Sequence, residues 1–403
     1  MEPDQDTAKT QPARLCRRCK EREARLKIRG DPACRECYCR YINTKVIKRL
    51  EALRREFPGS EAPRRYLVGL SFGVSSSCLV QVLDDASQNQ LRKRQAVAFE
   101  PVVIHVDTDL SASESSLSSA SELLGRFRER YPRFTFERIP LEAVLELDTV
   151  DWASLPTLAG GGGDQLPRER LQTLFARLPS ATSRADVLRL LVRHVLVAAA
   201  RRHGCDALLL GHSTTALAEL TLGETAKGRG FSLAWQTGDG RVPIVRYPTP
   251  GTSSGEDSSM DERSPEANAH SLLVYYPLRE TFRKELFNYA ALITPPLTDL
   301  MPEEAKGKTR PVVSHKDMSI EEVMARYFEE VEESYPSVVA NVVRTTTKLE
   351  RLGAEGLCAL CGTVLDEQGD ERWAGEIGDD GGGEPGETSR ARLCYGCKRS
   401  LRA

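Results

Sequence analysis

The sequence predicts an α/β protein built on a doubly wound, mainly parallel sheet, with a small cysteine-rich metal element at each end of the chain. Three observations predict this architecture. Apolar runs of strand length alternate with helical patterns through the middle of the chain. The apolar run at residues 66–70 breaks into a turn of small residues that leads directly into a helix. Paired Cys-x-x-Cys motifs lie before and after this core.

The composition is that of an ordinary globular protein, with 403 residues, a formal net charge of −2 and 40% hydrophobic residues. No apolar stretch reaches the ~20 residues that a membrane-spanning helix needs. The N-terminal residues are polar and lack the apolar core of a secretion signal. We therefore expect a cytoplasmic protein without membrane contact, in which the paired spacing found among the 11 cysteines indicates metal sites rather than disulfides.

The chain is expected to begin with a disordered polar tail at residues 1–13, followed by a metal element with a linking helix at residues 14–60. Two Cys-x-x-Cys motifs separated by 14 residues are typical of one tetrahedral, structural zinc site. Cys39 is an alternative fourth ligand, and four unrelated buried cysteines are the alternative to a metal site. The predicted ligands are Cys16, Cys19, Cys34 and Cys37.

The metal element is also strongly basic. Residues 14–55 contain 15 Lys and Arg against 5 Asp and Glu, in a chain that is close to neutral as a whole. Such a local excess predicts contact with the phosphates of RNA, while a solvated surface on an amphipathic helix at residues 42–57 is the alternative. The predicted RNA-binding residues here are Arg17, Arg18, Arg25 and Arg29.

Residues 61–300 are predicted to form the α/β core. The turn at residues 71–77 precedes a helix, whose unpaired N–H groups and positive dipole favour an anionic phosphate. It lacks the Gly-Lys-Ser/Thr ending of a Walker A loop. Ser71, Gly73 and Ser76 are the candidate phosphate-binding residues. Further strands are predicted at residues 101–107, 134–139, 205–211 and 272–278, helices at 120–131, 185–202 and 281–292, and a polar loop at 84–93.

Ligands of such sheets bind at the carboxyl ends of the strands, so Ser71, Asp107 and the segment Gly211-His212-Ser213 are expected to converge. Within the core, residues 249–268 form an insertion rich in Ser, Asp, Glu and Pro that is expected to be disordered. The Gly-rich turn at residues 226–230 offers Lys227 and Arg229, which suit either a phosphate contact or an ordinary surface turn.

Residues 301–352 are predicted to be a helical segment, with helices at 319–334 and 337–352. Residues 353–403 carry a second pair of Cys-x-x-Cys motifs around an acidic loop at 366–390, which contains nine Asp and Glu. Long insertions between two metal-binding turns are tolerated because closure entropy grows only logarithmically with length. The predicted ligands of this second zinc site are Cys358, Cys361, Cys394 and Cys397.

The turn resembles the S-G-G-x-D-S signature of PP-loop ATP pyrophosphatases. Ser71, Gly73 and Ser76 match three positions of this signature. With the flanking zinc motifs and the segments VGLSFGVSS, LGHSTTALAELTLGETAKGRGFSL and YPLRETFRKELFNYA, the chain resembles the cytoplasmic tRNA 2-thiolation protein 2 family. The resemblance implies a heterodimer with a catalytic sister subunit and sulfur supplied as a thiocarboxylate on a ubiquitin-related modifier. It also implies formation of 5-methoxycarbonylmethyl-2-thiouridine at the wobble position of lysine, glutamate and glutamine tRNAs.

Three departures from the family pattern of active enzymes predict that this chain is not itself catalytic. Phe72 stands at the first Gly of the loop, and Ser75 at its Asp. The second acidic pattern, G-H-N-x-D-D, reads GHSTTA at residues 211–216, so both Mg²⁺-binding carboxylates are missing. The Cys-x-x-Cys expected near residues 182–185 is absent, and Cys78 and Cys205 lie in apolar runs typical of inert thiols.

The leading hypothesis is therefore a non-catalytic subunit that binds tRNA and scaffolds an active partner, with ATP binding through the degenerate loop left open. One alternative is a self-sufficient ATP-dependent sulfurtransferase, in which Asp107 and Glu219 replace the missing carboxylates. Another is a zinc-ribbon nucleic-acid-binding protein whose α/β core is purely structural.

Overall fold

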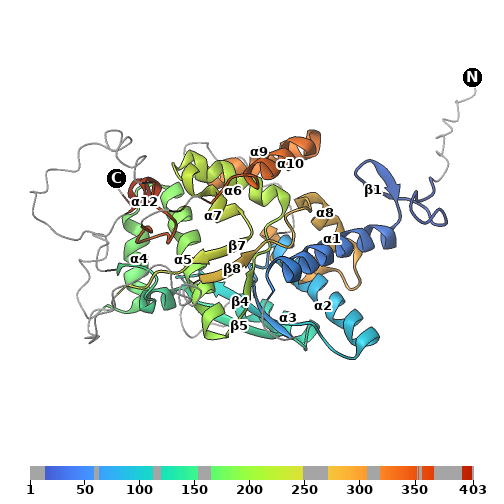
Figure 1. Cartoon of the computed structure of the whole chain (residues 1–403), viewed down its shortest axis with the longest axis horizontal. Coiled ribbons are helices and arrows are strands. Elements are labelled where there is room, and N and C mark those ends of the chain that lie inside the picture. The colour runs from blue at the N-terminus through green and yellow to red at the C-terminus, as the bar shows by residue number, and fades with distance from the viewer. Residues whose placement is uncertain are drawn as a thin grey trace, which may run out of the picture.

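A computed structural model describes residues 14–58, 63–111, 119–152, 165–247, 271–305, 318–351, 353, 356–366 and 393–401. The expected tail at 1–13 and the insertion at 249–268 lie outside these residues, as does the acidic loop beyond residue 366. Figure 1 shows an elongated molecule with the N-terminal cysteine-rich element at one end of the long axis and the C-terminal helix at the other. The α/β core lies between them.

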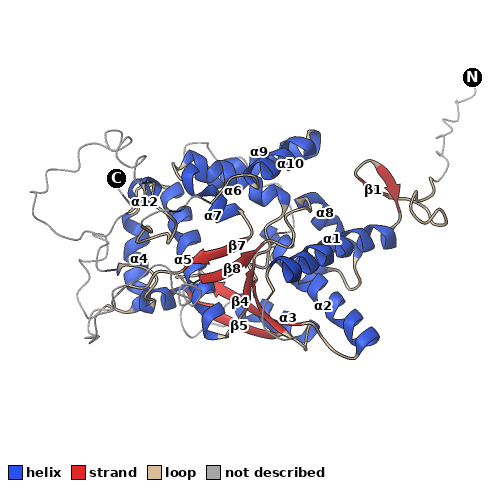
Figure 2. Ribbon diagram, in the orientation of Figure 1, coloured by secondary structure: helices blue, strands red, loops and turns tan. Residues whose placement is uncertain are grey.

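The core contains a six-stranded sheet in the order β5-β4-β3-β6-β8-β7. Its pairs are parallel except for β7 and β8, which run antiparallel at one edge. Figure 2 shows the sheet between helices. This arrangement confirms the predicted doubly wound, mainly parallel sheet. The strands are β3 (Arg64–Gly69), β4 (Phe99–Asp107), β5 (Thr135–Pro140), β6 (Ala207–Leu209), β7 (Gly240–Pro243) and β8 (Ser271–Tyr275).

Alternate side chains of the strands enter two separate apolar cores, because successive residues of a strand point to opposite faces. Tyr66 and Val68 of β3 belong to one core, and Leu67 belongs to the other. The first core is covered by α1 (Arg35–Glu56), α2 (Val74–Arg94), α3 (Ser119–Arg130) and α8 (Arg283–Leu292). The second is covered by α4 (Pro167–Arg177), α5 (Ala181–Arg202), α6 (Thr214–Ala226), α9 (Ile320–Ser334), α10 (Pro336–Thr346) and α12 (Tyr395–Leu401).

Short elements complete the chain. The N-terminal element contains a hairpin whose turn, Arg29-Gly30, has positive φ at both residues, as a two-residue I′ hairpin turn requires. The remaining elements are β1 (Leu26–Ile28), β2 (Asp31–Ala33), α7 (Leu233–Thr237) and the 3-10 helices Leu141–Glu146, Gly230–Ser232, Leu297–Leu300 and Glu303–Ala305.

The prediction of a polar loop at residues 84–93 is wrong, because α2 continues through this stretch to Arg94. The two carboxylates of this stretch, Asp84 and Asp85, are paired within the protein rather than solvated. Asp84 is buried, accepts a hydrogen bond from Gln88 Nε2 at 2.7 Å and forms an ion pair with Arg133, which follows α3. Long-range partners of this kind turn a polar sequence into one face of a buried helix.

Candidate functional site

The N-terminal cysteines gather in one group. The Sγ atoms of Cys16, Cys19, Cys34 and Cys37 all lie within 4.8 Å of one another. The hairpin β1–β2 joins the two motifs, and Cys34 is the N-cap residue of α1. The Cys19–Cys34 Sγ distance is 3.8 Å, which is the edge of about 3.8 Å expected for a tetrahedron with metal–sulfur bonds of ~2.3 Å. The group can hold a metal ion, and it includes Cys37 but not Cys39.

The C-terminal cysteines form a second group of the same kind, with the four Sγ atoms of Cys358, Cys361, Cys394 and Cys397 within 4.8 Å of one another. All four side chains are buried. The Cys361–Cys394 Sγ distance is again 3.8 Å, and the Cys394 backbone N–H donates to Cys358 Sγ at 3.3 Å. Four thiolates arranged in this way can hold a metal ion. Such an ion would connect α12, which carries Cys397, to the second apolar core.

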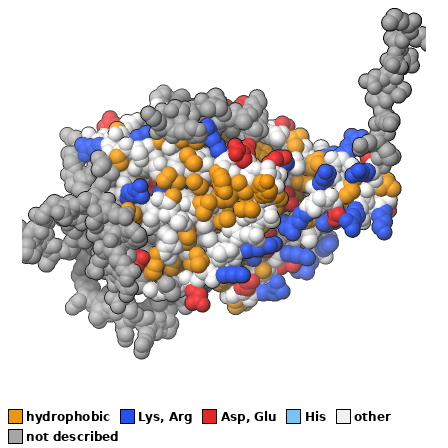
Figure 3. Space-filling view, turned by 90° about the horizontal axis from the view of Figure 1, so that it is seen from above, with side chains coloured by type: hydrophobic (Ala, Val, Ile, Leu, Met, Phe, Trp, Pro, Cys, Tyr) orange, Lys and Arg blue, Asp and Glu red, His pale blue; other side chains and the backbone are white. Residues whose placement is uncertain are grey.

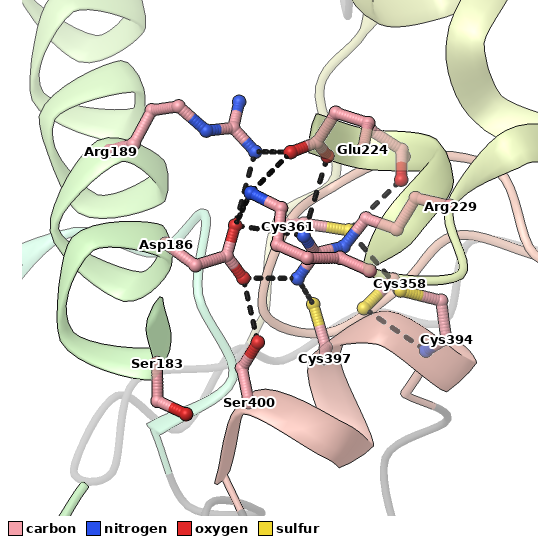
Figure 4. Close-up of polar contacts among 12 residues, drawn as sticks. Ser183, Asp186, Arg189, Glu224, Arg229, Cys358, Cys361, Cys394, Cys397 and Ser400 are labelled. Carbon is pink, nitrogen blue, oxygen red and sulfur yellow. Dashed lines mark hydrogen bonds and ion pairs between the residues drawn. The ribbon is translucent and has the colours of Figure 1, made fainter. Parts of the chain in front are cut away.

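Arg229 links this cysteine group to a buried ion cluster (Figure 4). Its guanidinium donates to both carboxylate oxygens of Asp186, at 2.8 and 2.6 Å, and to Cys397 Sγ at 3.3 Å. Lys227 Nζ lies 2.8 Å from Asp186 Oδ1 and 2.6 Å from Glu224 Oε1. We call Asp186, Arg189, Glu224, Lys227, Arg229 and Glu321 the ion cluster.

The ion cluster corrects the expectation that Lys227 and Arg229 contact RNA. The two residues are 5% and 2% exposed, and their charges are already paired with carboxylates. Burial tends to raise the pKa of Asp186, but the hydrogen bonds and charge of Arg229 and the charge of Lys227 lower it overall. Their Gly-rich turn is a structural junction between α6 and the C-terminal element.

The loop between β3 and α2, which the sequence predicts to bind phosphate, is held by its own serines. The Ser71 backbone N–H donates to Ser76 Oγ at 3.2 Å, and the Ser76 hydroxyl donates to the Gly73 carbonyl oxygen at 3.1 Å. Gly73 is the N-cap residue of α2 and supplies no side-chain cap. The first backbone N–H groups of α2 therefore face this loop, and no side chain of the N-cap residue accepts a hydrogen bond from them. The loop brings Ser71, Gly73 and Ser76 together, as the sequence predicts.

Phe72 adopts the left-handed backbone conformation, with φ of 58°, at the position where the signature has glycine. A left-handed conformation costs a residue with a Cβ on the order of 1 kcal/mol. The ring is buried, with its centroid 4.3 Å from that of His105 and 5.7 Å from that of Phe127. The side chain packs into the core rather than into the loop, so the Phe72 ring does not line the cavity in front of the loop.

A cavity of about 560 Å³ opens in front of this loop, within the usual size range of a small-ligand site. Ser71, Gly211 and His212 line it, as expected from the ends of β3 and β6. Gly211 must be glycine, because a Cβ there would lie 2.8 Å from Ser76 Cα. Burial, together with the charges of nearby arginines, lowers the pKa of His212 to about 4, so this imidazole is neutral near pH 7.

Among the described residues that line the cavity, none is Asp, Glu or Cys. Asp107 ends β4 but does not line the cavity; its Oδ2 lies 2.7 Å from Arg138 Nη1. Glu219 is held by both terminal nitrogens of Arg283, at 2.7 and 2.6 Å. The two carboxylates that the self-sufficient enzyme needs in place of the missing Mg²⁺ ligands are thus engaged by arginines.

The core thiols do not approach the cavity. Cys78 is completely buried in α2, where burial raises its pKa, and its thiol donates to the Leu286 carbonyl oxygen at 3.5 Å. Cys205 precedes β6, and burial raises its pKa to about 11. A thiolate nucleophile is therefore not available from either residue at neutral pH.

The predicted RNA-binding arginines are exposed on the N-terminal element, at the end of the molecule where Figure 3 shows Lys and Arg side chains gathered. Two of them are paired locally: Arg17 with Asp31, and Arg25 with Glu23 at 3.0 Å. The Arg18 guanidinium lies 5.1 Å from the centre of the Tyr41 ring. Arg29 is fixed in the hairpin turn.

Comparisons with known proteins agree with this description. A sequence model of the family described as cytoplasmic tRNA 2-thiolation protein 2 matches residues 319–399. Proteins of that name from Phaeosphaeria nodorum and Pyrenophora tritici-repentis are 40% and 37% identical to the chain, and each alignment covers 96% of this chain and 94% of the relative. The U34-tRNA thiolase NcsA from Methanococcus maripaludis, solved with its 4Fe-4S cluster, has a TM-score of 0.51 and 15% identity, covering 89% of this chain and 95% of that chain.

The parallel sheet, the loop between β3 and α2 and the two four-cysteine groups define an α/β protein with the PP-loop thiolase fold. Within this class, the chain belongs to the cytoplasmic tRNA 2-thiolation protein 2 family. None of its described helices is both long and apolar enough to cross a membrane.

Proposed function

We propose that this chain is a non-catalytic, tRNA-binding subunit of a cytoplasmic complex that thiolates the wobble uridine of lysine, glutamate and glutamine tRNAs. The observation that carries the proposal is the cavity itself. It keeps the helix N-terminus of an ATP site, but none of its described lining residues is a carboxylate or a thiol. Adenylation needs Mg²⁺ held against pyrophosphate, and sulfur transfer needs a reactive thiol or cluster.

The partner is a catalytic sister subunit that supplies the missing carboxylates and thiols, with sulfur carried as a thiocarboxylate on a ubiquitin-related modifier. Family membership supports this assignment. Zinc suits both four-cysteine groups, because all-thiolate tetrahedra with 3.8 Å edges are typical of closed structural sites. The first N–H groups of α2, which face the cavity, can still bind the phosphates of ATP. Without Mg²⁺-binding carboxylates, the bound ATP would not be cleaved.

The experiment is a reconstitution with ATP, Mg²⁺, tRNA and the thiocarboxylated modifier, in which thiolated wobble uridine is measured by mass spectrometry. We expect product only when this chain and the sister subunit are both present. Asp107→Asn in this chain should leave the activity of the pair intact, because Asp107 pairs with Arg138 outside the cavity. Thiolation by this chain alone, abolished by Asp107→Asn, would establish the self-sufficient enzyme instead.

A further inference from the structure

A second hollow lies away from the nucleotide-type cavity, between α1 and α2 on the face of the first apolar core. It has a volume of about 800 Å³. Buried apolar residues, among them Tyr66 and Phe99, form its floor. Exposed polar side chains from the two helices form its walls. We call this hollow the α1–α2 groove.

The walls of the groove are positively charged. α1 contributes Arg40 and Arg54, and α2 contributes Lys93 and Arg94, against the single carboxylate of Glu51. All four cationic side chains are exposed, and in the part of the chain that the structure describes none of them forms an ion pair. Arg17 and Arg25 of the N-terminal element, in contrast, already have carboxylate partners. An incoming anion therefore displaces no internal partner in the groove.

The spacing of these charges suits a chain of phosphates rather than one small anion. Arg40 and Arg54 are 14 residues apart on one helix, which corresponds to about 21 Å at 1.5 Å per residue. This length is much greater than one small anion and can follow several consecutive phosphates of a nucleic-acid strand. The N-terminal element, which is also rich in Lys and Arg, precedes α1 directly (Figure 1).

We propose that the α1–α2 groove binds the phosphate backbone of tRNA through Arg40, Arg54, Lys93 and Arg94. The proposal rests on the proposed function, because it locates where that subunit holds its RNA. Rigid helices present these cations without the cost of ordering a loop, and each phosphate contact releases condensed counterions. The groove contributes affinity that is independent of base sequence, since no base-reading contact is implied.

The test measures binding of a tRNA transcript to the full chain by filter binding between 50 and 200 mM salt. Lys93→Gln/Arg94→Gln should reduce the magnitude of the log–log salt slope by about 1.4–1.8 units, at 0.7–0.9 units for each phosphate contact. The quadruple variant that adds Arg40→Gln and Arg54→Gln should roughly double that loss. The matched control, Arg344→Gln/Lys348→Gln, removes the same charge from exposed residues at the end of α10 and should leave the slope unchanged.

The outcomes separate the two proposals. If the wild-type chain binds tRNA and the groove variants keep its salt slope, the groove is not the RNA surface, although the proposed function stands. If the control variant weakens tRNA binding as much as Lys93→Gln/Arg94→Gln does, the affinity depends on the net charge of the chain and not on the groove. The groove proposal is then wrong. If the wild-type chain, alone and with the sister subunit, binds no tRNA, the proposed function itself falls.

Discussion

Replacing Arg229 tests whether the ion cluster supports the C-terminal metal site. The side chain is 2% exposed and touches two fully buried carboxylates, Asp186 and Glu224, together with Cys397 Sγ. The ion cluster contains three cations and three anions and is neutral. Arg229→Met fills most of the volume but leaves the cluster with one uncompensated negative charge beside the four thiolates.

The magnitude follows from these contacts. Removing one partner from a buried charge pair costs about 3–5 kcal/mol, against a typical total stability of about 5–15 kcal/mol. The lost hydrogen bond to a ligand thiolate should weaken metal binding by roughly 10–100-fold, as loss of an outer-shell partner commonly does. Arg229→Lys keeps the charge but loses the two-nitrogen fork to Asp186, so its effects should be intermediate.

The assay is the metal content of the purified chain by mass spectrometry during a chelator titration, with urea unfolding followed in parallel. Wild type should retain two metal ions per chain, whereas Arg229→Met should release one of them at a lower chelator concentration. Arg344→Met, an exposed position on α10, is the control and should behave as wild type. Equal metal retention and equal urea midpoints for Arg229→Met and wild type would refute the reasoning.

Two further predictions concern the N-terminal metal site and the pH dependence of stability. Cys37→Ser should cost the chain one metal ion, while Cys39→Ser should retain both, because Cys39 lies outside the cysteine group; metal content decides, and the reverse result would place Cys39 in the site. His212 has a pKa lowered by burial to about 4. The unfolded chain therefore binds the additional proton below pH 6.5, and stability falls as the pH drops from 6.5 toward 4. Between pH 7.5 and pH 5, the free energy of unfolding measured in urea should fall by up to about 2 kcal/mol less in His212→Gln than in wild type. An identical fall in both proteins would contradict the lowered pKa of His212.

The parts of the fold that the sequence predicted correctly are those with local signals. Strands β3, β4, β6 and β8 are largely apolar runs that contribute buried side chains to both faces of the sheet, so their sequences are nearly continuous in hydrophobicity. The edge strand β5 keeps only Phe136 and Ile139 buried. The phosphate loop is encoded by the small residues between a strand and a helix. The cysteine groups are encoded by the spacing of their motifs, and the N-terminal group contains Cys37 rather than Cys39, as the Cys-x-x-Cys spacing predicts.

The features that could not be predicted depend on partners far along the chain. Arg229 looks like a surface cation in its Gly-rich turn, but its carboxylate partner Asp186 lies 43 residues earlier. The buried carboxylate of Asp84 in α2 is paired with Arg133, 49 residues further along the chain. The direction of the Phe72 ring is set by His105 and Phe127.

The α1–α2 groove also requires two helices to be placed side by side. Helical spacing alone puts Arg40 and Arg54 on one face of α1, and this signal was available in the sequence. Lys93 is the last residue of the stretch predicted to be a polar loop, and Arg94 follows it, so their position opposite α1 could be found only from the structure.

The central claim is that the cavity keeps the loop and helix N-terminus of an ATP-cleaving site but, among its described lining residues, has none of the carboxylates or thiols that the reaction needs. The most direct measurement is formation of AMP and pyrophosphate from ATP and Mg²⁺, in the presence of tRNA, by this chain alone and by the chain with its sister subunit. The account predicts no AMP from the chain alone and AMP from the pair. Mg²⁺-dependent release of AMP by the isolated chain would contradict it.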